Sequence, residues 1–338
     1  MSTEYESVTL SQNGNSSYEP LTDPSKNRLT VFPIEYLDIW DAYKKQLASF
    51  WTAEEIDFSK DYEDFQKLNK DEQHFIKMVL AFFAASDTIV NINIGERFIK
   101  DVQIREAIIC YNYQMMMENI HSEVYSLQID NIIHDTEEKN KMFRAIEYFP
   151  CVAKKADWAK KWTESDAPFA QRLIAFAIVE GVFFSGSFAS IFWLKNKGNF
   201  LLALQNSNAV ISKDEMSHCS FAILLYSHIR NKLSEETIHN MIKEAVLIEI
   251  EFICESLKCA LLGINPTSMI QYIKYVADRL LVMLNYNKIY NVSNPFDFME
   301  LISLENKSNF FENRTTEYQR ASVLNKTKEK TFELTEDF

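Results

Sequence analysis

Glycine and proline are both scarce in this sequence of 338 residues, which contains six glycines and seven prolines. Each type makes up about 2% of the chain, against typical values of about 7% and 5%. Because these residues form many turns, their scarcity predicts a few long helices joined by short loops, and 47% apolar residues supply a substantial core. The length allows one large domain or two average ones.

Positive charge and paired cysteines are lacking as well. The net charge is −13 at pH 7, which argues against a general nucleic-acid binder, because few groups would neutralise phosphates. The five cysteines form no CxxC pair, and most lie among apolar residues, so we expect reduced, buried thiols in a cytoplasmic protein. The N-terminal MSTEYESVTL has neither the basic nor the apolar region of a secretory signal.

One apolar run is long enough to span a membrane, namely LIAFAIVEGVFFSGSFASIFWL at residues 173–194. Glu180 interrupts it near the middle, and a charge at that depth is unfavourable in lipid. A helix that is apolar all round is equally typical of the centre of a helical bundle. We favour the bundle and expect no membrane partner.

The hydrophobic pattern predicts an all-α bundle between two polar tails. Residues 1–28 are expected to form a flexible arm, residues 29–305 the helical domain and residues 306–338 a flexible tail. Thr52 and Glu55 resemble a capping box at the start of a further helical turn. The expected helices are 34–50, 71–99, 105–133, 136–148, 152–162, 167–196, 208–231, 234–262 and 266–286.

The pattern Glu-x-x-His occurs three times. An i, i+3 pair can offer one metal ion an oxygen and a nitrogen ligand from the same helix face, although one pair alone is a weak signal. The pairs are Glu118/His121, Glu215/His218 and Glu236/His239. The third follows Ser234, which resembles an N-cap, and acids suit a first helical turn. We therefore interpret the third pair as a solvated helix start.

The first two pairs lie in apolar surroundings, and two further acids, Asp87 and Glu180, stand almost alone in apolar helices. Burying four carboxylates without positive charge is strongly unfavourable. Bound cations are the simplest compensation. Four carboxylates and two imidazoles suit two ions of iron, or of iron and manganese, rather than a thiolate zinc site. One acid from each of two helices with Glu-x-x-His from each of two others is the ligand pattern of ferritin-like di-metal bundles.

Four segments carry a family resemblance: AFFAASD (81–87), MENIHSEVYS (117–126), VEGVFFSGSFASIFW (179–193) and ISKDEMSHC (211–219). They resemble the radical-generating small subunit of class I ribonucleotide reductase, most closely its eukaryotic and large-DNA-virus branch. The likeness covers about residues 28–338, in the family's order. It implies a ferritin-like bundle with extra helices that forms a homodimer and works with a large catalytic subunit.

The resemblance implies a role for each residue of a buried site. The implied metal ligands are Asp87, Glu118, His121, Glu180, Glu215 and His218. Two iron ions, with manganese not excluded, would react with O2. Tyr125 matches the position of the stable tyrosyl radical, and Phe184, Phe188 and Ile211 match the apolar pocket that shields it.

The resemblance also implies a route from the site to the partner. Trp51 and Asp214 match positions that connect the centre to the surface through His121, and Tyr318 matches the tail tyrosine that passes the radical between subunits. The terminal FELTEDF resembles the family's docking peptide, with Phe332, Leu334 and Phe338 as its apolar anchors.

Two features depart from the family pattern. Lys213 stands where arginine is usual, and residues 198–208 are one residue longer than in close relatives.

Two other functions also remain open on the pattern of ligands. Another di-iron oxidase or desaturase would use the same bundle but has no use for Tyr318 or FELTEDF. An iron-storage bundle needs neither Trp51 nor a shielded tyrosine.

Overall fold

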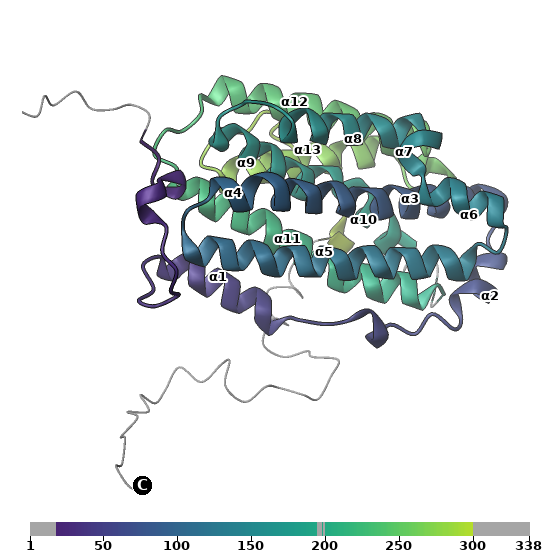
Figure 1. Cartoon of the computed structure of the whole chain (residues 1–338). Helices are drawn as coiled ribbons and strands as arrows, with labels where there is room; N and C mark the ends of the chain where they lie inside the picture. Colours follow the sequence, from purple (N-terminus) through teal and green to yellow (C-terminus); the bar gives the residue numbers. More distant parts are fainter. Residues whose placement is uncertain (1–17, 195–197, 199, 300–338) are drawn as a thin grey trace, which may run out of the picture.

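The computed structural model describes residues 18–194, 198 and 200–299 (Figure 1). This part of the chain consists of helices and connecting loops and contains no strand. The predicted all-α class is therefore confirmed. The α-helices are α1 (Leu37–Ala48), α2 (Asp61–Gln66), α3 (Lys70–Asn93), α4 (Ile99–Asp101), α5 (Arg105–Ile132), α6 (Thr136–Phe143), α7 (Ala145–Tyr148), α8 (Pro150–Thr163), α9 (Phe169–Ile178), α10 (Ser185–Leu194), α11 (Leu202–His228), α12 (Glu235–Ile250) and α13 (Pro266–Met283).

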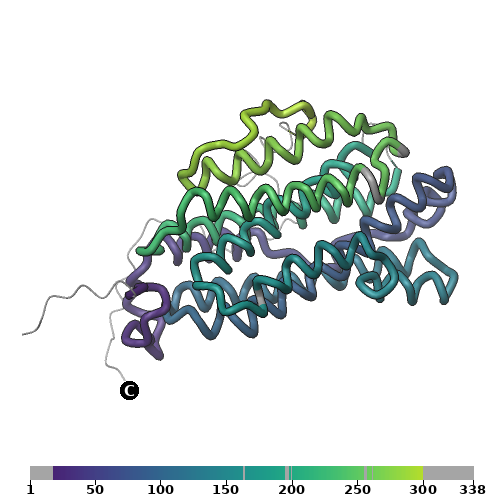
Figure 2. The backbone as a smooth tube through the Cα atoms, turned by 90° about the horizontal axis from the view of Figure 1, so that it is seen from above, coloured from purple at the N-terminus to yellow at the C-terminus, as the bar shows by residue number. Residues whose placement is uncertain are grey.

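Four long segments form the inner bundle: α3, α5, α11 and the stretch from α9 to α10. Helix α3 packs along α5, α9 packs along α11, and α5 also contacts α11. Helix α1 covers α5 from outside, while α8, α12 and α13 cover the opposite side (Figure 1). Seen from above, the elements run mostly along one long direction, with the C-terminal helices gathered at one flank (Figure 2). Side chains at the centre of this bundle are shielded by helices on every side.

Three π-helical turns interrupt stretches for which the sequence predicts continuous helix. They are η4 (Ile94–Phe98), η5 (Val179–Phe183) and η7 (Glu251–Ser256). The predicted helix 234–262 is therefore wrong beyond Ile250, where η7 is followed by the 3-10 helix η8 (Cys259–Leu262). A π turn adds one residue to a helical turn and is often found at functional sites.

Helix α11 begins at Leu202, six residues before the predicted start at residue 208. Its preceding residue, Leu201, has a φ of 51° and no capping side chain of its own. The carboxylate of Asp61 accepts the backbone N–H groups of Ala203 and Leu204 at 3.0 and 2.9 Å, and Asp64 accepts that of Leu201 at 2.9 Å. The cap comes from α2, far away in sequence, so no local signal marked this helix start.

The apolar run at residues 173–194 lies in the middle of the bundle. Two stretches, Lys70–Asp101 and Phe169–Leu194, are long and apolar enough to span a membrane by composition. Their most apolar windows are 56% and 94% buried inside the protein. Packing among other helices accounts for the apolar character of Phe169–Leu194, as expected for the central helix of a bundle.

Residues 20–28, which fall within the expected flexible arm, pack on the bundle. Two short 3-10 helices, η1 (Pro20–Thr22) and η2 (Pro24–Lys26), lie here, and Leu21 is fully buried. The Leu21 carbonyl accepts the N–H of Gln103, and Arg28 pairs with Glu106 on α5. The polar character of this segment hid these anchors, so the expectation of a loose arm is wrong for residues 20–28.

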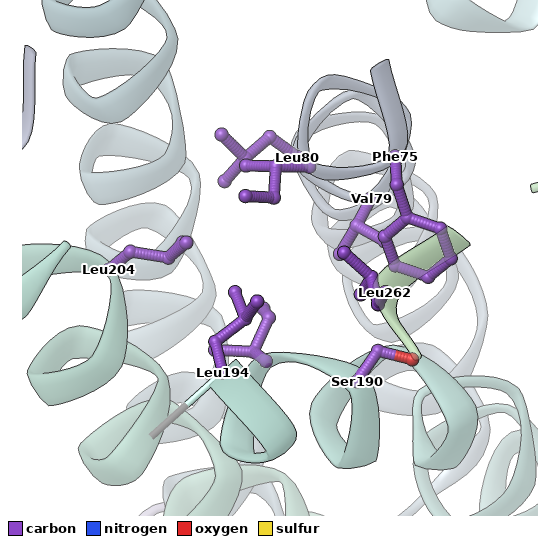
Figure 3. A pocket seen from close by; sticks show the side chains of 9 residues that line it. Phe75, Val79, Leu80, Ser190, Leu194, Leu204 and Leu262 are labelled. Carbon is purple, nitrogen blue, oxygen red and sulfur yellow. The ribbon is translucent and has the colours of Figure 1, made fainter. Parts of the chain in front are cut away.

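An apolar pocket lies between α3, α10, α11 and η8 (Figure 3). Phe75, Leu80, Leu194 and Leu204 project into it, and it has no room for a water molecule. Its polar residue, Ser190, donates its hydroxyl to the carbonyl of Gly186 at 2.8 Å. The pocket is therefore a packing region and offers no polar group to a ligand.

Candidate metal centre

The six side chains expected to bind metal meet in the middle of the inner bundle. Asp87 comes from α3, Glu118 and His121 from α5, Glu180 from the π turn η5, and Glu215 and His218 from α11. Each Glu-x-x-His pair lies on a continuous helix, so i, i+3 spacing points both members the same way. All six are at most 3% exposed. The fold therefore brings these acids and imidazoles together.

The side chains form two overlapping groups that share Glu118. Asp87, Glu118 and His121 make one group, and the second comprises Glu118, Glu180, Glu215 and His218, with potential ligand atoms within 4.8 Å of one another in each group. Glu118 Oε1 lies 2.8 Å from His218 Nδ1, and Glu215 Oε1 lies 3.0 Å from His121 Nδ1. Glu118 on α5 thus contacts the imidazole of α11, and Glu215 on α11 contacts the imidazole of α5.

The donor atoms of this cluster fit two bound cations. Several of them are buried and make no hydrogen bond within the described part of the chain: Asp87 Oδ2, both oxygens of Glu180 and His218 Nε2. Unpaired buried polar atoms are rare in folded proteins. Four carboxylates facing one another also repel, and positive ions would satisfy both their charge and their lone pairs.

Proton affinities in the cluster reflect the same excess of negative charge. Burial raises the pKa of Asp87 well above its usual range, and the carboxylates of Glu118 and Glu215 add to the effect. Burial also raises the pKa of Glu180. Burial disfavours the charged form of His218, but Glu118 and Glu215 outweigh it and raise the pKa of His218 to about 10. Strong perturbation of this kind is typical of functional sites.

Tyr125 lies one helical turn beyond His121 and is 1% exposed. The ring of Phe83 stacks on it, with centroids 4.7 Å apart and 7° between the planes. Its hydroxyl donates to Oδ1 of Asn208 at 3.3 Å, and Nδ2 of Asn208 is itself held by the carbonyl of Leu204. Burial, with further contributions from nearby carboxylates, raises the pKa of Tyr125 well above its usual range, so its phenol keeps its proton.

The expected apolar pocket residues Phe184, Phe188 and Ile211 are all buried. The ring centroid of Phe83 lies 5.8 Å from that of Phe184 and 4.9 Å from that of Phe188. Phe184 and Phe188 thus form an aromatic wall beside Phe83. The face of Tyr125 that Phe83 covers is therefore closed to water, because Phe83 is itself buried among aromatic side chains.

Trp51 and Asp214 connect the cluster to the loop after α1. The indole Nε1 of Trp51 donates to Asp214 Oδ2 at 2.8 Å, and the same oxygen lies 3.1 Å from His121 Nε2. The rings of Trp51 and His121 are also nearly parallel, 5.9 Å apart. A carboxylate that orients the second nitrogen of an imidazole is a common partner of metal-binding histidines.

The remaining sequence predictions have separate outcomes. Glu236 is exposed, Ser234 caps α12 by accepting the N–H of Thr237, and His239 contacts the carbonyl of Asn287. The interpretation of this third pair as a surface helix start is confirmed. Tyr318, Phe332, Leu334 and Phe338 lie outside the described residues.

A cavity of about 180 Å³ adjoins the cluster between α10, α11 and α13. Glu180 and Glu215 line its inner part, and Met216 and Met283, which are 37% and 39% exposed, line its outer part. Val276 also lines its wall. The cavity leads from the acids to the surface of the chain and is wide enough for small molecules.

Two residues at the site were missed by the sequence reasoning. Phe83 precedes Asp87 by four residues, so helical spacing alone would have placed both on one face. Asn208 lies three residues before Ile211 and seven before Glu215. It was overlooked because residue 208 was the predicted first residue of the helix.

Comparisons with known proteins agree with this geometry. The family model "Ribonucleotide reductase, small chain" matches residues 28–295. The sequence is 56% identical over 320 residues to the ribonucleoside-diphosphate reductase small chain of Vaccinia virus (strain Western Reserve), an alignment that covers 95% of this protein and 100% of the viral one. It is 57% identical over 307 residues to a ribonucleoside-diphosphate reductase small chain of Arabidopsis thaliana, covering 90% of this protein and 92% of the plant one.

A solved structure supports the same relationship. The ribonucleotide reductase Rnr4 homodimer of Saccharomyces cerevisiae is 39% identical, with a TM-score of 0.77 over 86% of this chain and 92% of that one. The R2 subunit of Clostridium botulinum, at 21% identity and a TM-score of 0.76 over 90% and 99%, shares the fold. With the family model matching most of its length, this chain belongs to the family of ribonucleotide reductase small chains.

Proposed function

We propose that the protein is the small subunit of a ribonucleoside-diphosphate reductase, and that it generates a radical on Tyr125 for a large catalytic subunit. One observation carries the proposal: a shielded tyrosine lies one helical turn from a buried cluster of four carboxylates and two imidazoles. The large subunit would reduce ribonucleotides to deoxyribonucleotides.

The six clustered side chains are the proposed ligands of two iron ions, although their oxygen and nitrogen donors also suit manganese. With O2, such a pair of ions supplies an oxidant strong enough to remove an electron from a phenol. The cavity beside Glu180 and Glu215 is the proposed entry path for O2. Each proposed ligand is held by a rigid inner helix or by the π turn η5.

The surroundings of Tyr125 suit a long-lived radical. Its phenol is protonated before oxidation, so loss of an electron is accompanied by loss of the hydroxyl proton, and the product is neutral. The Oδ1 atom of Asn208 orients the hydroxyl. Phe83 and the aromatic wall beside it keep water and reductants away from Tyr125. A neutral radical persists only where both are excluded.

The contacts from His121 through Asp214 to Trp51 are the proposed path along which an electron and a proton pass between the metal centre and the large subunit, in both directions. From there, transfer to the large subunit would use Tyr318. Docking would use the terminal peptide with Phe332, Leu334 and Phe338, whose apolar anchors among acids suit a groove on that partner. We expect a cytoplasmic homodimer.

The rival functions find less support in the site. An iron-storage bundle needs neither a shielded Tyr125 nor the contact between Trp51 and Asp214. Another di-iron oxidase or desaturase has no use for Tyr318 or for the terminal FELTEDF.

The test is to load iron into the purified metal-free protein in air and to record the EPR spectrum. A tyrosyl signal is expected in the wild type and absent in Tyr125→Phe, which loads the same amount of iron. A fully loaded wild-type protein without this signal would refute the proposal for Tyr125.

Removal of residues 332–338 should abolish reductase activity with the large subunit while the radical still forms. Loss of the radical in that truncation would contradict the docking role.

A further inference from the structure

The helix that carries Glu180 is broken at Phe184. The π turn η5 ends at Phe183, and α10 begins at Ser185. At such a break, backbone groups lose partners that a continuous helix would give them. The break is deep in the core, so its backbone groups need partners from elsewhere in the protein.

Lys155 and Glu249 supply these partners from two outer helices. Nζ of Lys155, on α8, donates to the carbonyl of Phe183 at 2.5 Å. Oε1 of Glu249, near the end of α12, accepts the N–H of Gly186 at 3.1 Å. The two side chains also pair with each other, with 2.6 Å between Nζ and Oε2, and both are at most 1% exposed. A buried ion pair therefore holds the backbone on both sides of Phe184.

The residues around this ion pair are matched to it. A Cβ atom at Gly186 would lie 2.6 Å from Oε1 of Glu249 and 2.6 Å from Cγ1 of Ile253, so only glycine permits the close approach of α12. The ammonium of Lys155 lies 3.6 Å from the ring centroid of Phe82 and 4.1 Å from that of Phe252. Aromatic faces attract a cation, so the two rings stabilise the charge of Lys155.

Each charge of the pair stabilises the other against burial. Burial lowers the pKa of Lys155 to about 8, although Glu249 works against this shift. Burial raises the pKa of Glu249 to about 7, and Lys155 works against that. Between these two values both groups are charged, which strengthens the contact that joins α8 to α12.

We propose that Lys155 and Glu249 are positioning residues, which hold the break at Phe184 and thereby fix Glu180 on one side and the aromatic wall beside Phe83 on the other. They act through the backbone of Phe183 and Gly186. The consequence for the metals and the radical rests on the proposed function, whereas the consequence for the backbone does not.

The wall connects the pair to Tyr125. Phe184 lies within the break itself, and its ring contacts those of Phe83 and Phe188. Because Phe83 stacks on Tyr125, a shift at the break would open the shield of the radical. It would also move Glu180, three residues before Phe183, relative to the other acids.

The chain offers a matched control for an experiment. Lys154, next to Lys155 on α8, forms an ion pair with Glu251, two residues after Glu249. Unlike the buried pair, their side chains are 49% and 42% exposed. Exposed pairs contribute little to stability. Lys154→Met and Glu251→Gln therefore remove a similar contact without touching the break.

The first readout is amide hydrogen exchange of the metal-free protein over residues 180–190. We expect at least tenfold faster exchange in Lys155→Met and in Glu249→Leu, and a rate within twofold of wild type in both control variants. Glu249→Gln keeps an acceptor for the N–H of Gly186 but loses the charge opposite Lys155, so its rate should lie between those of wild type and Glu249→Leu. If Lys155→Met does not fold, the contrast between Glu249→Leu and Glu249→Gln decides the matter.

The second readout is the decay of the tyrosyl EPR signal after metal loading. We expect decay at least fivefold faster in Lys155→Met and Glu249→Leu than in Glu249→Gln. Exchange that rises equally in all helices, or unchanged exchange and decay in both variants, would overturn the proposal. A wild type without a radical would refute the proposed function alone, because the exchange experiment does not depend on the radical.

Discussion

Phe83 lies flat against Tyr125, with 4.7 Å between the ring centroids. Both residues are 1% exposed, and they come from different helices, α3 and α5. Phe83 in turn packs beside Phe184 and Phe188. The role of Phe83 can be isolated because Phe75, a second phenylalanine of α3, is equally buried but distant from the metal cluster.

Phe83→Ala should lower the free energy of unfolding by about 3–5 kcal/mol, since it leaves a cavity in the core. It should also shorten the lifetime of the tyrosyl radical at least tenfold, because the cavity opens beside Tyr125. Chemical denaturation and EPR decay measure the two effects. Phe75→Ala, in the closed pocket of Figure 3, should cost a similar free energy and leave the decay unchanged. Equal radical lifetimes in both variants would show that Phe83 is not a shield.

Trp51→Phe should separate radical formation from radical use. Phenylalanine cannot donate to Asp214, so the contact from Trp51 Nε1 is lost while most of the packing remains. The radical on Tyr125 should form in normal yield, whereas reductase activity with the large subunit should fall at least a hundredfold. EPR and a turnover assay measure these quantities.

A second tryptophan provides the control for that experiment. Trp193 also donates its indole N–H, to the carbonyl of Leu262 at 3.1 Å, but it lies away from the path. Trp193→Phe should keep both the radical and the activity. Comparable loss of activity in the two variants would mean that Trp51 matters for packing alone.

The ligand cluster was predictable because its signal is local. A charged residue in an apolar helix is conspicuous, and the i, i+3 spacing of Glu118 with His121 survives in any straight helix. Asp87 stood out for the same reason. Four such acids in one apolar chain left little choice except a site where they meet.

The break in the helix of Glu180 was not predictable in this way. Residues 173–194 are apolar on all sides, so a π turn changes no visible periodicity. The start of α11 was hidden for a different reason, since its capping groups, Asp61 and Asp64, lie in another helix. Long-range polar contacts of this kind leave no trace in a local pattern.

Val276→Phe should slow formation of the radical without reducing its final yield. Val276 lines the cavity between the cluster and the surface, and a larger side chain there narrows the path for O2. We expect at least a fivefold lower rate of radical formation in stopped-flow experiments. Val282→Phe, on the same helix at a position that is 50% exposed, should leave the rate unchanged. A normal rate in Val276→Phe would exclude this cavity as the entry path.

Asp61→Ala should destabilise the start of α11. Its carboxylate accepts from Ala203, Leu204 and the side chain of Gln128, at 3.0, 2.9 and 2.7 Å. Each buried donor left without a partner costs about 1–3 kcal/mol, so we expect a loss of about 3 kcal/mol or more in the free energy of unfolding. Asp64→Ala frees one backbone N–H, that of Leu201, and removes an ion pair with the exposed Lys67, so it should cost less.

The effect of Asp61→Ala should reach the site through α11. Asn208 lies in the second turn of this helix and orients the hydroxyl of Tyr125, whereas Glu215 and His218 lie further along. Fraying of the first turns should therefore accelerate radical decay while the amount of bound metal stays unchanged. Metal analysis and EPR decay on the same sample measure this. Loss of metal together with the radical would instead mean that the cap at Asp61 supports the whole helix rather than its first turns.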